Sequence, residues 1–313
     1  MKVLITGGAG FIGSHAAGKF LDLGADVYIL DNLSTGSRQN LDKRAHFLNL
    51  DLTDESFVDH LPKDHIDTVV HLAAQSSGEI SFERPSYDLK TNTLGTLLLL
   101  KWSLEHHVGK FIYASSMSVY GDGRDFPVTE RDPVNPKSFY GVGKCASENY
   151  IKIFADMGLP ATCLRFFNVY GPGQNMSNLK QGMVSIYLSY IAQDQPILVK
   201  GSLDRYRDFV YIDDVINAIM LSHSDQRADG KIFNVCTGRN VRIRELLQVI
   251  IESFGKDPSY PVIQGEPTPR DQYGVFGNYD LIHTALGWSP EISLEVGISR
   301  MADWVKKYYL KNV

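Results

Sequence analysis

The two side chains best placed for acid–base chemistry are Tyr140 and Lys144, which stand four residues apart. Residues at i and i+4 are neighbours on one face of a helix. A nearby ammonium favours the phenolate over the phenol and lowers the tyrosine pKa from its ordinary value of about 10. The pair therefore predicts a base that takes a proton from an alcohol near neutral pH. Such an alcohol also needs an acceptor for its hydride, and the N-terminal residues predict a site for one.

A glycine-rich loop follows the first apolar run and precedes a helical pattern; it reads Gly7-Gly8-Ala9-Gly10-Phe11-Ile12-Gly13. Glycines permit a tight turn and let backbone amides approach a pyrophosphate, which then rests on the helix N-terminus. Asp31 ends the next predicted strand, where a carboxylate accepts hydrogen bonds from both ribose hydroxyls and repels a 2′-phosphate. The combination favours NAD over NADP; the alternative is a plain βα turn followed by a helix-capping aspartate.

Two later strand ends also carry polar side chains. Asp51, with Leu52, follows the third predicted strand; it is placed either to meet an adenine or to cap the following helix. Ser115 and Ser116 end another strand, where a hydroxyl can hydrogen-bond a substrate oxygen beside a tyrosine base. Serines are common at strand ends, so the prediction rests on the set that includes Tyr140.

Short apolar runs alternate with helix-length segments in the first half of the chain. The predicted strands are Lys2–Thr6, Asp26–Asp31, His46–Asn49, Thr68–Leu72, Lys110–Ser115 and Ala161–Phe166. The predicted helices include Ile12–Leu23, Thr91–His106 and Tyr140–Met157. This alternation is typical of an α/β fold with a Rossmann-type doubly wound parallel sheet, which binds ligands beyond the carboxyl ends of its strands.

The pattern changes after Asn168, where prolines separate shorter elements. We predict an NAD-binding Rossmann domain over residues 1–168 and a smaller, interleaved C-terminal substrate domain over residues 169–313. Two segments, 207–215 and 232–237, are predicted to return to the first domain.

Composition excludes several classes of function. The 313 residues carry a net charge of −5 and a pI of about 6.0, which argues against bulk nucleic-acid binding. No apolar run approaches the length of a membrane span, and the N-terminus lacks a signal-peptide pattern. Cys145, Cys163 and Cys236 are scattered, which indicates reduced thiols and no local metal cluster. We therefore expect a cytoplasmic protein with no nucleic-acid or membrane partner and no bound metal.

A series of motifs occurs in the order found in one known family. They are Gly7/Gly10/Gly13, Asp31, His71-Leu72-Ala73-Ala74, Asn92-Thr93-Leu94-Gly95-Thr96, Ser116…Val119-Tyr120-Gly121, Tyr140…Lys144, Arg165-Phe166-Phe167-Asn168-Val169-Tyr170-Gly171-Pro172 and Arg207-Asp208-Phe209-Val210. Over nearly its whole length the chain resembles the extended short-chain dehydrogenases/reductases that modify nucleotide sugars, and most of all the NAD-dependent UDP-glucose (UDP-galactose) 4-epimerases.

The resemblance implies a role for each matching residue. Tyr140 is the base, Lys144 binds the nicotinamide ribose, and Ser116 holds the 4-hydroxyl of the sugar, so these are the implied catalytic residues. The implied NAD-binding residues are Gly7, Gly10, Phe11, Ile12, Gly13, Asp31, Asn32, Asp51, Leu52, Leu72, Ala73, Ala74, Asn92, Ser115, Tyr140, Lys144 and Phe167. The implied substrate-binding residues are Ser116, Met117, Tyr140, Asn168, Leu179, Lys200, Arg207 and Arg270.

The implied reaction is inversion at C4 of a UDP-hexose through a transient 4-keto sugar, with hydride passing to NAD and back. The implied assembly is a homodimer formed through the helices Thr91–His106 and Tyr140–Met157. Met117 and Ser118 stand where related 4,6-dehydratases carry Asp-Glu and decarboxylases a Glu. Epimerisation at C4 therefore leads. The alternatives are another nucleotide-sugar-modifying activity (a 4,6-dehydratase, a decarboxylase or a C2 epimerase), a net oxidoreductase and a catalytically idle NAD-binding regulator.

Three positions depart from the family pattern on the substrate side. The chain reads Thr268-Pro269-Arg270-Asp271 where relatives commonly have Arg-Pro-Gly-Asp, so the arginine is displaced by two positions. Lys200 replaces an aromatic residue that stacks on the base in many relatives. Val275 aligns near a bulky position that restricts the sugar pocket, and we hypothesise that a larger sugar such as an N-acetylhexosamine is tolerated.

Overall fold

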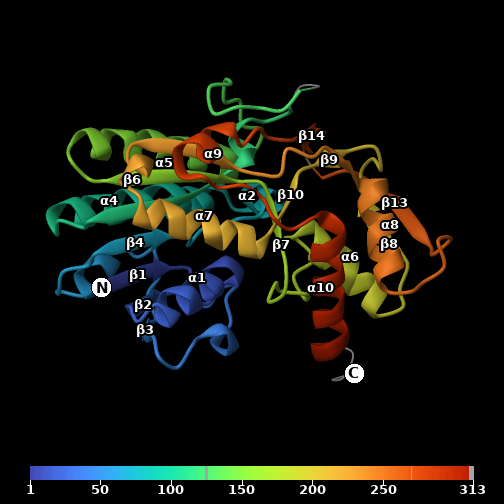
Figure 1. Cartoon of the computed structure of the whole chain (residues 1–313), viewed down its shortest axis with the longest axis horizontal. Coiled ribbons are helices and arrows are strands. Elements are labelled where there is room, and N and C mark those ends of the chain that lie inside the picture. The colour runs from blue at the N-terminus through green and yellow to red at the C-terminus, as the bar shows by residue number, and fades with distance from the viewer. Residues whose placement is uncertain (124–125, 269, 310–313) are drawn as a thin grey trace.

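A seven-stranded parallel sheet forms the centre of the computed structural model, which describes residues 1–123, 126–268 and 270–309 (Figure 1). The strand order is β11-β6-β5-β4-β1-β2-β3, with every neighbouring pair parallel. The strands are β1 (Lys2–Thr6), β2 (Asp26–Leu30), β3 (His46–Leu48), β4 (Thr68–His71), β5 (Lys110–Ser116), β6 (Ala161–Phe166) and β11 (Lys231–Val235). The predicted Rossmann-type fold is confirmed.

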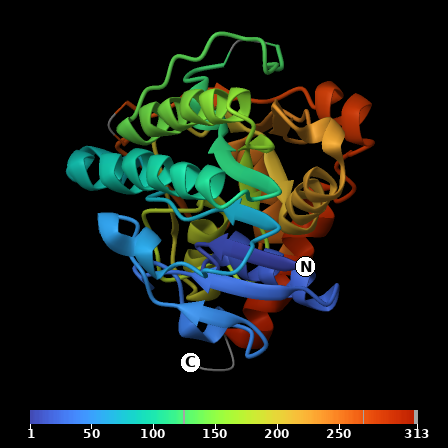
Figure 2. The ribbon, with the colours of Figure 1, turned by 90° about the vertical axis from the view of Figure 1, so that its left-hand side faces the viewer.

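Helices cover both faces of this sheet (Figures 1 and 2). Two of them, α4 and α5, lie side by side on one face, and α1 and α7 pack together on the other. Their bounds are α1 (Phe11–Asp22), α4 (Gly95–Glu105), α5 (Phe139–Asp156) and α7 (Ile212–Ser224). Short helices connect these layers: η1 (Arg38–Asn40), η2 (Glu55–His60), α2 (Gly78–Glu83), α3 (Pro85–Leu89), η3 (Lys90–Leu94), η4 (Met117–Val119) and η5 (Gln226–Ala228).

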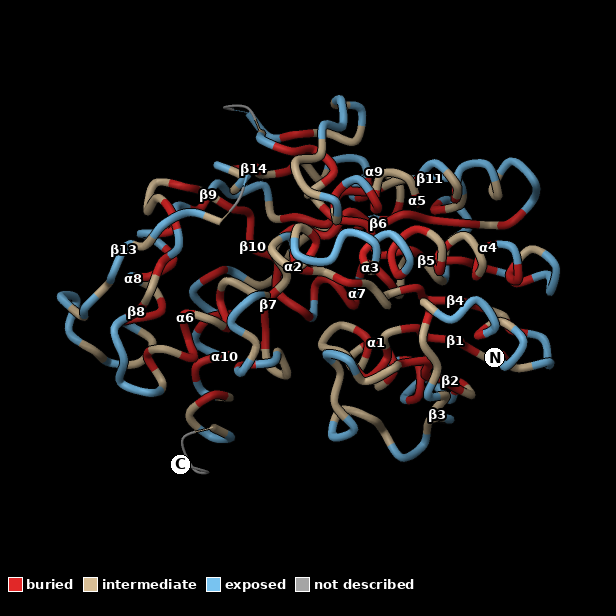
Figure 3. The backbone as a smooth tube through the Cα atoms, turned by 180° about the vertical axis from the view of Figure 1, so that it is seen from behind, coloured by how far each residue is buried: buried red, intermediate tan, exposed pale blue. Residues whose placement is uncertain are grey.

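The strands are buried on both sides, as their β-branched sequences predict. Val3 and Ile5 of β1 pack in the cluster that contains Phe20 of α1, whereas Leu4 packs in the opposite cluster with Trp102 of α4. This alternation follows from the two-residue period of a strand. Figure 3 shows the result as a band of buried backbone through the sheet, with exposed loops around it.

Smaller elements of the C-terminal half adjoin this sheet. Its helices are α6 (Met183–Ala192), α8 (Ile243–Ser253), α9 (Asp280–Leu286) and α10 (Leu294–Tyr308). Its strands form three small sheets with the orders β10-β7, β12-β9-β14 and β13-β8. Their bounds are β7 (Asn168–Tyr170), β8 (Ile197–Lys200), β9 (Tyr206–Arg207), β10 (Phe209–Tyr211), β12 (Val241–Arg242), β13 (Val262–Gly265) and β14 (Gly274–Val275).

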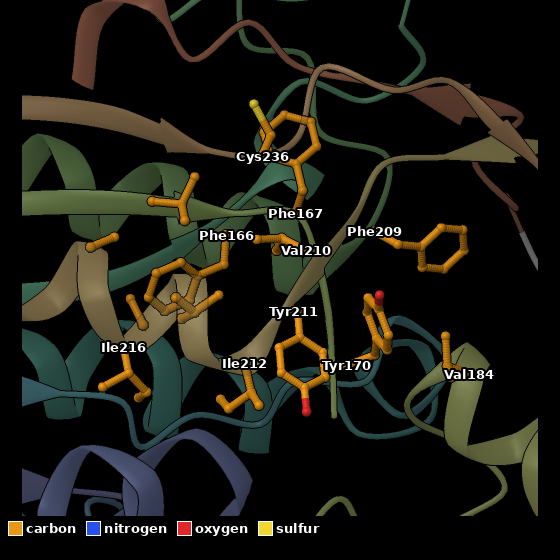
Figure 4. Packing of buried hydrophobic residues seen from close by; sticks show 14 of the residues in the cluster. Phe166, Phe167, Tyr170, Val184, Phe209, Val210, Tyr211, Ile212, Ile216 and Cys236 are labelled. Atoms are coloured by element: carbon orange, nitrogen blue, oxygen red, sulfur yellow. The ribbon is translucent and has the colours of Figure 1, made fainter. Parts of the chain in front are cut away.

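The two segments predicted to return to the first domain behave differently. β11 joins the large sheet beside β6. β10 instead pairs with β7 outside that sheet, and it is the following helix, α7, that packs against α1. Figure 4 shows how aromatic residues of this region, including Phe166, Tyr170 and Tyr211, pack where the two halves of the chain meet.

The helix predicted over Thr91–His106 has an irregular start, because the π-helical turn η3 precedes α4. A π-helical turn carries one more residue per hydrogen-bonded ring than an α-helix and often occurs at functional sites. Among the residues described, no helix combines the length and apolar character that crossing a bilayer requires.

Candidate functional site

A cleft opens at the carboxyl ends of the parallel strands, where the fold predicts a ligand site. One side of it is made by residues that end strands or directly follow them, such as Gly7, Asp31, Leu72 and Ser116. The opposite side comes from the C-terminal half, through residues 174, 181–184, 207, 209 and 270–272. The cleft is therefore built by both halves of the chain.

The glycine loop is shaped for close backbone approach. Gly7 has φ +72°, and a Cβ there would lie 2.7 Å from the Ala73 nitrogen. A Cβ on Gly13 would lie 2.1 Å from the Gly7 carbonyl oxygen, so a larger residue cannot close this turn. Helix α1 then begins at the N-cap Gly10 without a side-chain cap or an acidic residue in its first turn. Its amides are thus left for an anion, as pyrophosphate binding requires.

Two carboxylates border the same end of the cleft. Asp31 accepts the Ala9 amide at 3.0 Å and the Leu33 amide at 2.7 Å, which fixes it beside the glycine loop. Burial raises the pKa of Asp31, and these two hydrogen bonds oppose that rise. Asp51 accepts a hydrogen bond from Asn32 at 2.9 Å. Asp31 and Asp51, which the sequence predicts to contact the adenosine part of NAD, both line the cleft.

Several buried polar atoms of the cleft have no partner among the described residues. They are the Thr91 and Ser118 hydroxyl oxygens and the Gln174 Oε1 atom. Unsatisfied buried polar atoms are rare in native proteins and usually face a ligand or water. Together with the uncapped helix and Asp31, they show that the cleft fits a polar dinucleotide and a second polar ligand.

The predicted chemical residues meet in the middle of this cleft. Ser116 ends β5, and its hydroxyl also accepts the Ser118 amide at 3.2 Å. Tyr140 lies in the first turn of α5, whose N-cap Ser138 accepts the Gly141 amide at 3.1 Å. Burial raises the pKa of Tyr140 to about 12, and a hydrogen bond with Ser116 opposes the rise. The expected lowering of this pKa is therefore not seen in the protein alone.

Lys144 explains that difference. Its ammonium donates to the Ala114 carbonyl oxygen at 2.6 Å and lies 4.6 Å from the ring centroid of Tyr113, but 5.8 Å from that of Tyr140. Burial lowers the pKa of Lys144 to about 8. The i, i+4 spacing does place both side chains in the cleft, yet burial has the largest effect on the pKa of each.

Two positively charged residues line the substrate side. Arg207 is buried, and its guanidinium donates to the carbonyl oxygens of Tyr206, Gln272 and Tyr273 at 2.7, 2.6 and 3.1 Å. Burial lowers its pKa to about 10, against the opposing effect of Asp271. Arg207 thus holds the 272–273 backbone as well as lining the cleft, whereas Arg270 is exposed at its edge.

Most predicted site residues line the cleft: Gly7, Gly10, Phe11, Ile12, Gly13, Asp31, Asn32, Asp51, Leu52, Leu72, Ala73, Ala74, Ser115, Ser116, Met117, Tyr140, Lys144, Phe167, Asn168, Arg207 and Arg270. Asn92, Leu179 and Lys200 are not among its lining residues. Asn92 is buried behind the cleft, where its side chain bonds the Gln75 backbone and Asp88. Leu179 is exposed, and Lys200 pairs with Glu79 at 3.0 Å.

Val275 does not line the cleft either, because it is fully buried in β14 opposite Arg207. It therefore gives no support to the hypothesis of a larger sugar. Pro269, from the displaced motif, lies outside the described residues.

The sequence did not single out several residues that complete the site. They are Ser76, Glu79, Phe82, Tyr87 and Thr91 on the α2–η3 side, and Gln174, Gln181 and Met183 on the opposite side. Gln174 follows the Gly171-Pro172-Gly173 turn and could have been chosen as a polar residue after a strand. The others have no local signal, since tertiary contacts such as the Gln181–Ser76 hydrogen bond of 2.5 Å bring them together.

Comparison with known proteins agrees with this geometry. The family described as "NAD dependent epimerase/dehydratase family" matches residues 3–236. A putative UDP-glucose 4-epimerase of Methanocaldococcus jannaschii is 35% identical over 306 residues, which cover 97% of this chain and 98% of that protein.

Two solved structures are similar over nearly their full length. The UDP-glucose 4-epimerase of Thermotoga maritima with UDP-glucose has a TM-score of 0.94 and 36% identity, covering 98% of this chain and 99% of that one. The UDP-glucose 4-epimerase of Thermus thermophilus in complex with NAD has a TM-score of 0.91 and 34% identity, covering 98% of this chain and 100% of that one.

Proposed function

Since the chain belongs to the NAD-dependent epimerase/dehydratase family, we propose that it is a nucleotide-sugar epimerase that inverts C4 of a UDP-hexose with NAD. One observation carries the proposal: Tyr140, Lys144 and Ser116 share a single cleft with the glycine loop and Asp31. Tyr140 and an NAD held by the glycine loop and Asp31 would therefore both reach one sugar bound in this cleft.

Each chemical residue has a distinct task in this mechanism. Ser116 orients the 4-hydroxyl, and Tyr140 takes its proton. Lys144 supplies positive charge that favours the phenolate and holds the nicotinamide ribose. When bound, NAD⁺ supplies a hydride acceptor, so that no external oxidant is consumed. After the 4-keto sugar presents its other face and regains the hydride at C4 on that face, Tyr140 returns the proton to the 4-oxygen, and the configuration at C4 is inverted.

The substrate side fits a diphosphate and a neutral sugar. Arg207 and Arg270 provide positive charge at the cleft, while Asn168, Gln174 and Gln181 provide neutral polar groups. Elimination of water across C5–C6 would need an acid and a base at positions 117 and 118. Met117 cannot serve, and Ser118 carries only a hydroxyl, so epimerisation is favoured over a 4,6-dehydratase.

The test is incubation of the purified protein with UDP-glucose, UDP-galactose, UDP-GlcNAc or UDP-GlcA without added NAD, followed by ¹H NMR of the anomeric protons. We expect UDP-glucose and UDP-galactose to interconvert and NAD to be released when the protein is denatured. Turnover that requires stoichiometric free NAD⁺ and accumulates NADH would identify a net oxidoreductase instead. Bound NAD with no conversion of any sugar would identify an NAD-binding regulator.

The assignment of residues 1–168 to NAD and of residues 169–313 mainly to the nucleotide sugar is part of the proposal, as is a cytoplasmic location. We further propose a homodimer through α4 and α5, which lie side by side on the outside of the molecule (Figure 2). The outer face of α5 leaves Val142 and Ile153 52% and 55% exposed, which a partner would cover. Light scattering of Ile153→Glu should show monomers, whereas a monomeric wild-type protein would contradict the dimer.

A further inference from the structure

Asp88 is a carboxylate buried behind α5, and none of the described residues donates a charged hydrogen bond to it. Asp88 of α3 is 1% exposed and accepts hydrogen bonds from the side-chain amides of Gln75 at 2.7 Å and Asn92 at 3.1 Å. Both bonds arrive at the same oxygen, Oδ2. Burial raises the pKa of Asp88, and the two amide hydrogen bonds together with the positive charge of Lys144 oppose that rise.

The other oxygen of Asp88 faces α5. A Cβ on Gly143 would lie 3.5 Å from Oδ1, so the lack of a side chain at Gly143 lets the two helices approach. The next residue along α5 is Lys144, which is 3% exposed. Its ammonium has one hydrogen bond, to the Ala114 carbonyl oxygen, among the contacts of the described residues. A buried cation and a buried anion thus stand on packed neighbouring elements.

The other titratable groups around Lys144 are weaker counter-charges than Asp88; Glu148 also raises the pKa of Lys144, but less than Asp88 does. Glu148, one turn further along α5, is committed to Arg165 through bonds of 2.9 and 2.7 Å. Burial raises the pKa of Cys163 and of Tyr113 on the adjoining strands, which keeps both neutral. His71 on β4 is also kept neutral, because burial lowers its pKa to about 3. Tyr140 is a neutral phenol in this structure, because burial raises its pKa to about 12.

We propose that Asp88 is a positioning residue that provides the buried counter-charge of Lys144 and keeps this lysine charged during turnover. Burial lowers the pKa of Lys144, and Asp88 is the largest opposing influence. The same carboxylate disfavours the Tyr140 phenolate. Asp88 therefore sets the pH range over which the catalytic pair works. For its effect on turnover, this inference rests on the proposed function.

The position of Asp88 also ties this charge to the cofactor side of the cleft. Through Gln75 it holds the end of the segment that contains the cleft-lining Ala73 and Ala74. Through Asn92 it holds η3, and the Asn92 carbonyl oxygen accepts the hydroxyl of Ser147 on α5 at 2.8 Å. Asp88 thus links the segment that contains Ala73 and Ala74, the π-helical turn η3 and the helix α5.

The variant Asp88→Asn separates charge from structure. Because both hydrogen bonds arrive at Oδ2, an asparagine whose carbonyl oxygen takes that place retains both. Only the charge and the acceptor at Oδ1 are lost. The matched control is Asp214→Asn: Asp214 is also buried and accepts two neutral donors, the Glu291 and Ile292 amides, but lies outside the cleft lining.

Removal of a negative charge lowers the pKa of every neighbouring group. We expect Asp88→Asn to move both limbs of the kcat–pH profile about one unit toward acid, since one unit corresponds to a modest charge interaction. Asp214→Asn and the charge-retaining Asp88→Glu should leave both limbs in place. A lower kcat at every pH with unmoved limbs would mean that Asp88 is only structural, and would overturn the proposal.

A second readout does not depend on activity. In NAD-loaded protein whose lysines carry ¹³C at Cε, the resonance absent from Lys144→Met reports the titration of Lys144, and its midpoint should fall by about one unit in Asp88→Asn. An unchanged midpoint would overturn the proposal even if the enzyme is an epimerase. A shifted midpoint in a protein without epimerase activity would support it while the proposed function fails. If Asp88→Asn does not fold, Asp88→Ser removes the same negative charge together with both hydrogen bonds at Oδ2, and the same fall in the midpoint is expected.

Discussion

The two walls of the cleft are stabilised in different ways. We define the catalytic wall as β5, β6 and α5, and the loop wall as residues 174–184 and 270–272 with the adjoining strand end at Lys200. In the catalytic wall, Glu148 makes a two-bond ion pair with Arg165 and accepts the Ser115 hydroxyl at 2.5 Å, all in buried surroundings.

The loop wall has a largely buried ion pair between Asp271 and Arg205. It is also held by hydrogen bonds of Arg207 to backbone carbonyl oxygens and by the exposed Lys180–Glu83 pair. The proposed chemical residues thus lie on regular elements of the sheet layer, and the loop wall depends more on contacts between loops.

The largest effect should come from the catalytic wall. Tyr140→Phe removes the acid–base hydroxyl and leaves the ring, so kcat should fall by about 10³-fold, within the range of general acid–base catalysis. NAD released on denaturation should remain at the wild-type ratio, because the glycine loop is untouched. Tyr150→Phe on the same helix, outside the cleft lining, is the control and should behave like wild type. A near-normal kcat in Tyr140→Phe would mean that Tyr140, with its partner Lys144, does not carry out the proton transfer.

A stability experiment tests the rigidity of this wall. Glu148→Gln leaves the Arg165 guanidinium buried without its carboxylate, and we expect the free energy of unfolding in urea to fall by about 3–5 kcal/mol. The double variant Glu148→Met/Arg165→Met removes both charges and should recover much of that loss, because paired apolar replacements are often neutral. Equal destabilisation of the single and double variants would mean that packing, not charge pairing, stabilises the catalytic wall.

The catalytic wall was the more predictable of the two. Tyr140 and Lys144 are related by helix geometry, and Gly7, Asp31 and Ser116 by the ends of parallel strands; both relations follow from local sequence. Leu179 and Lys200 do not line the cleft, because tertiary contacts such as the Lys200–Glu79 pair decide where such residues lie; their substrate roles stay predictions. Asn92 is absent from the lining for a different reason: its amide bonds Gln75 and Asp88 inside the protein.

The pKa of Tyr140 shows a further limit of sequence reasoning. The spacing to Lys144 gives the sign of their interaction but not the cost of burial, which depends on every element packed around the phenol. In the structure burial is the larger effect, and the pKa is raised to about 12. The same reasoning missed Asp88, because nothing in its local sequence indicates that it is buried beside α5.

An intermediate effect is expected where the loop wall is anchored. Arg207→Met removes the charge and the three hydrogen bonds to backbone carbonyl oxygens. Hydrogen bonds to charged groups contribute about 1.5–3 kcal/mol, so KM for the UDP-sugar should rise roughly 10- to 100-fold while kcat changes little. Arg239→Met, which breaks an exposed pair with Glu295, is the control. A fall in kcat with unchanged KM would show that the two walls act as one unit.

The smallest effect should come from the exposed pairs that join α2 to the loop wall. Lys200, with a side chain 44% exposed, pairs with Glu79, and Lys180 pairs in the same way with Glu83 at 2.6 Å. Exposed pairs contribute about 0.2–1 kcal/mol, so Lys200→Ala and the matched Lys180→Ala should each raise KM less than about fivefold. In 1 M salt, where the Debye length is about 3 Å, the KM of each variant should equal that of the wild type. A rise in KM above tenfold that occurs only in Lys200→Ala and does not depend on salt would mean that Lys200 contacts the nucleotide during turnover. The loop wall would then close on the substrate through a side chain that the sequence had indicated and the cleft lining omits.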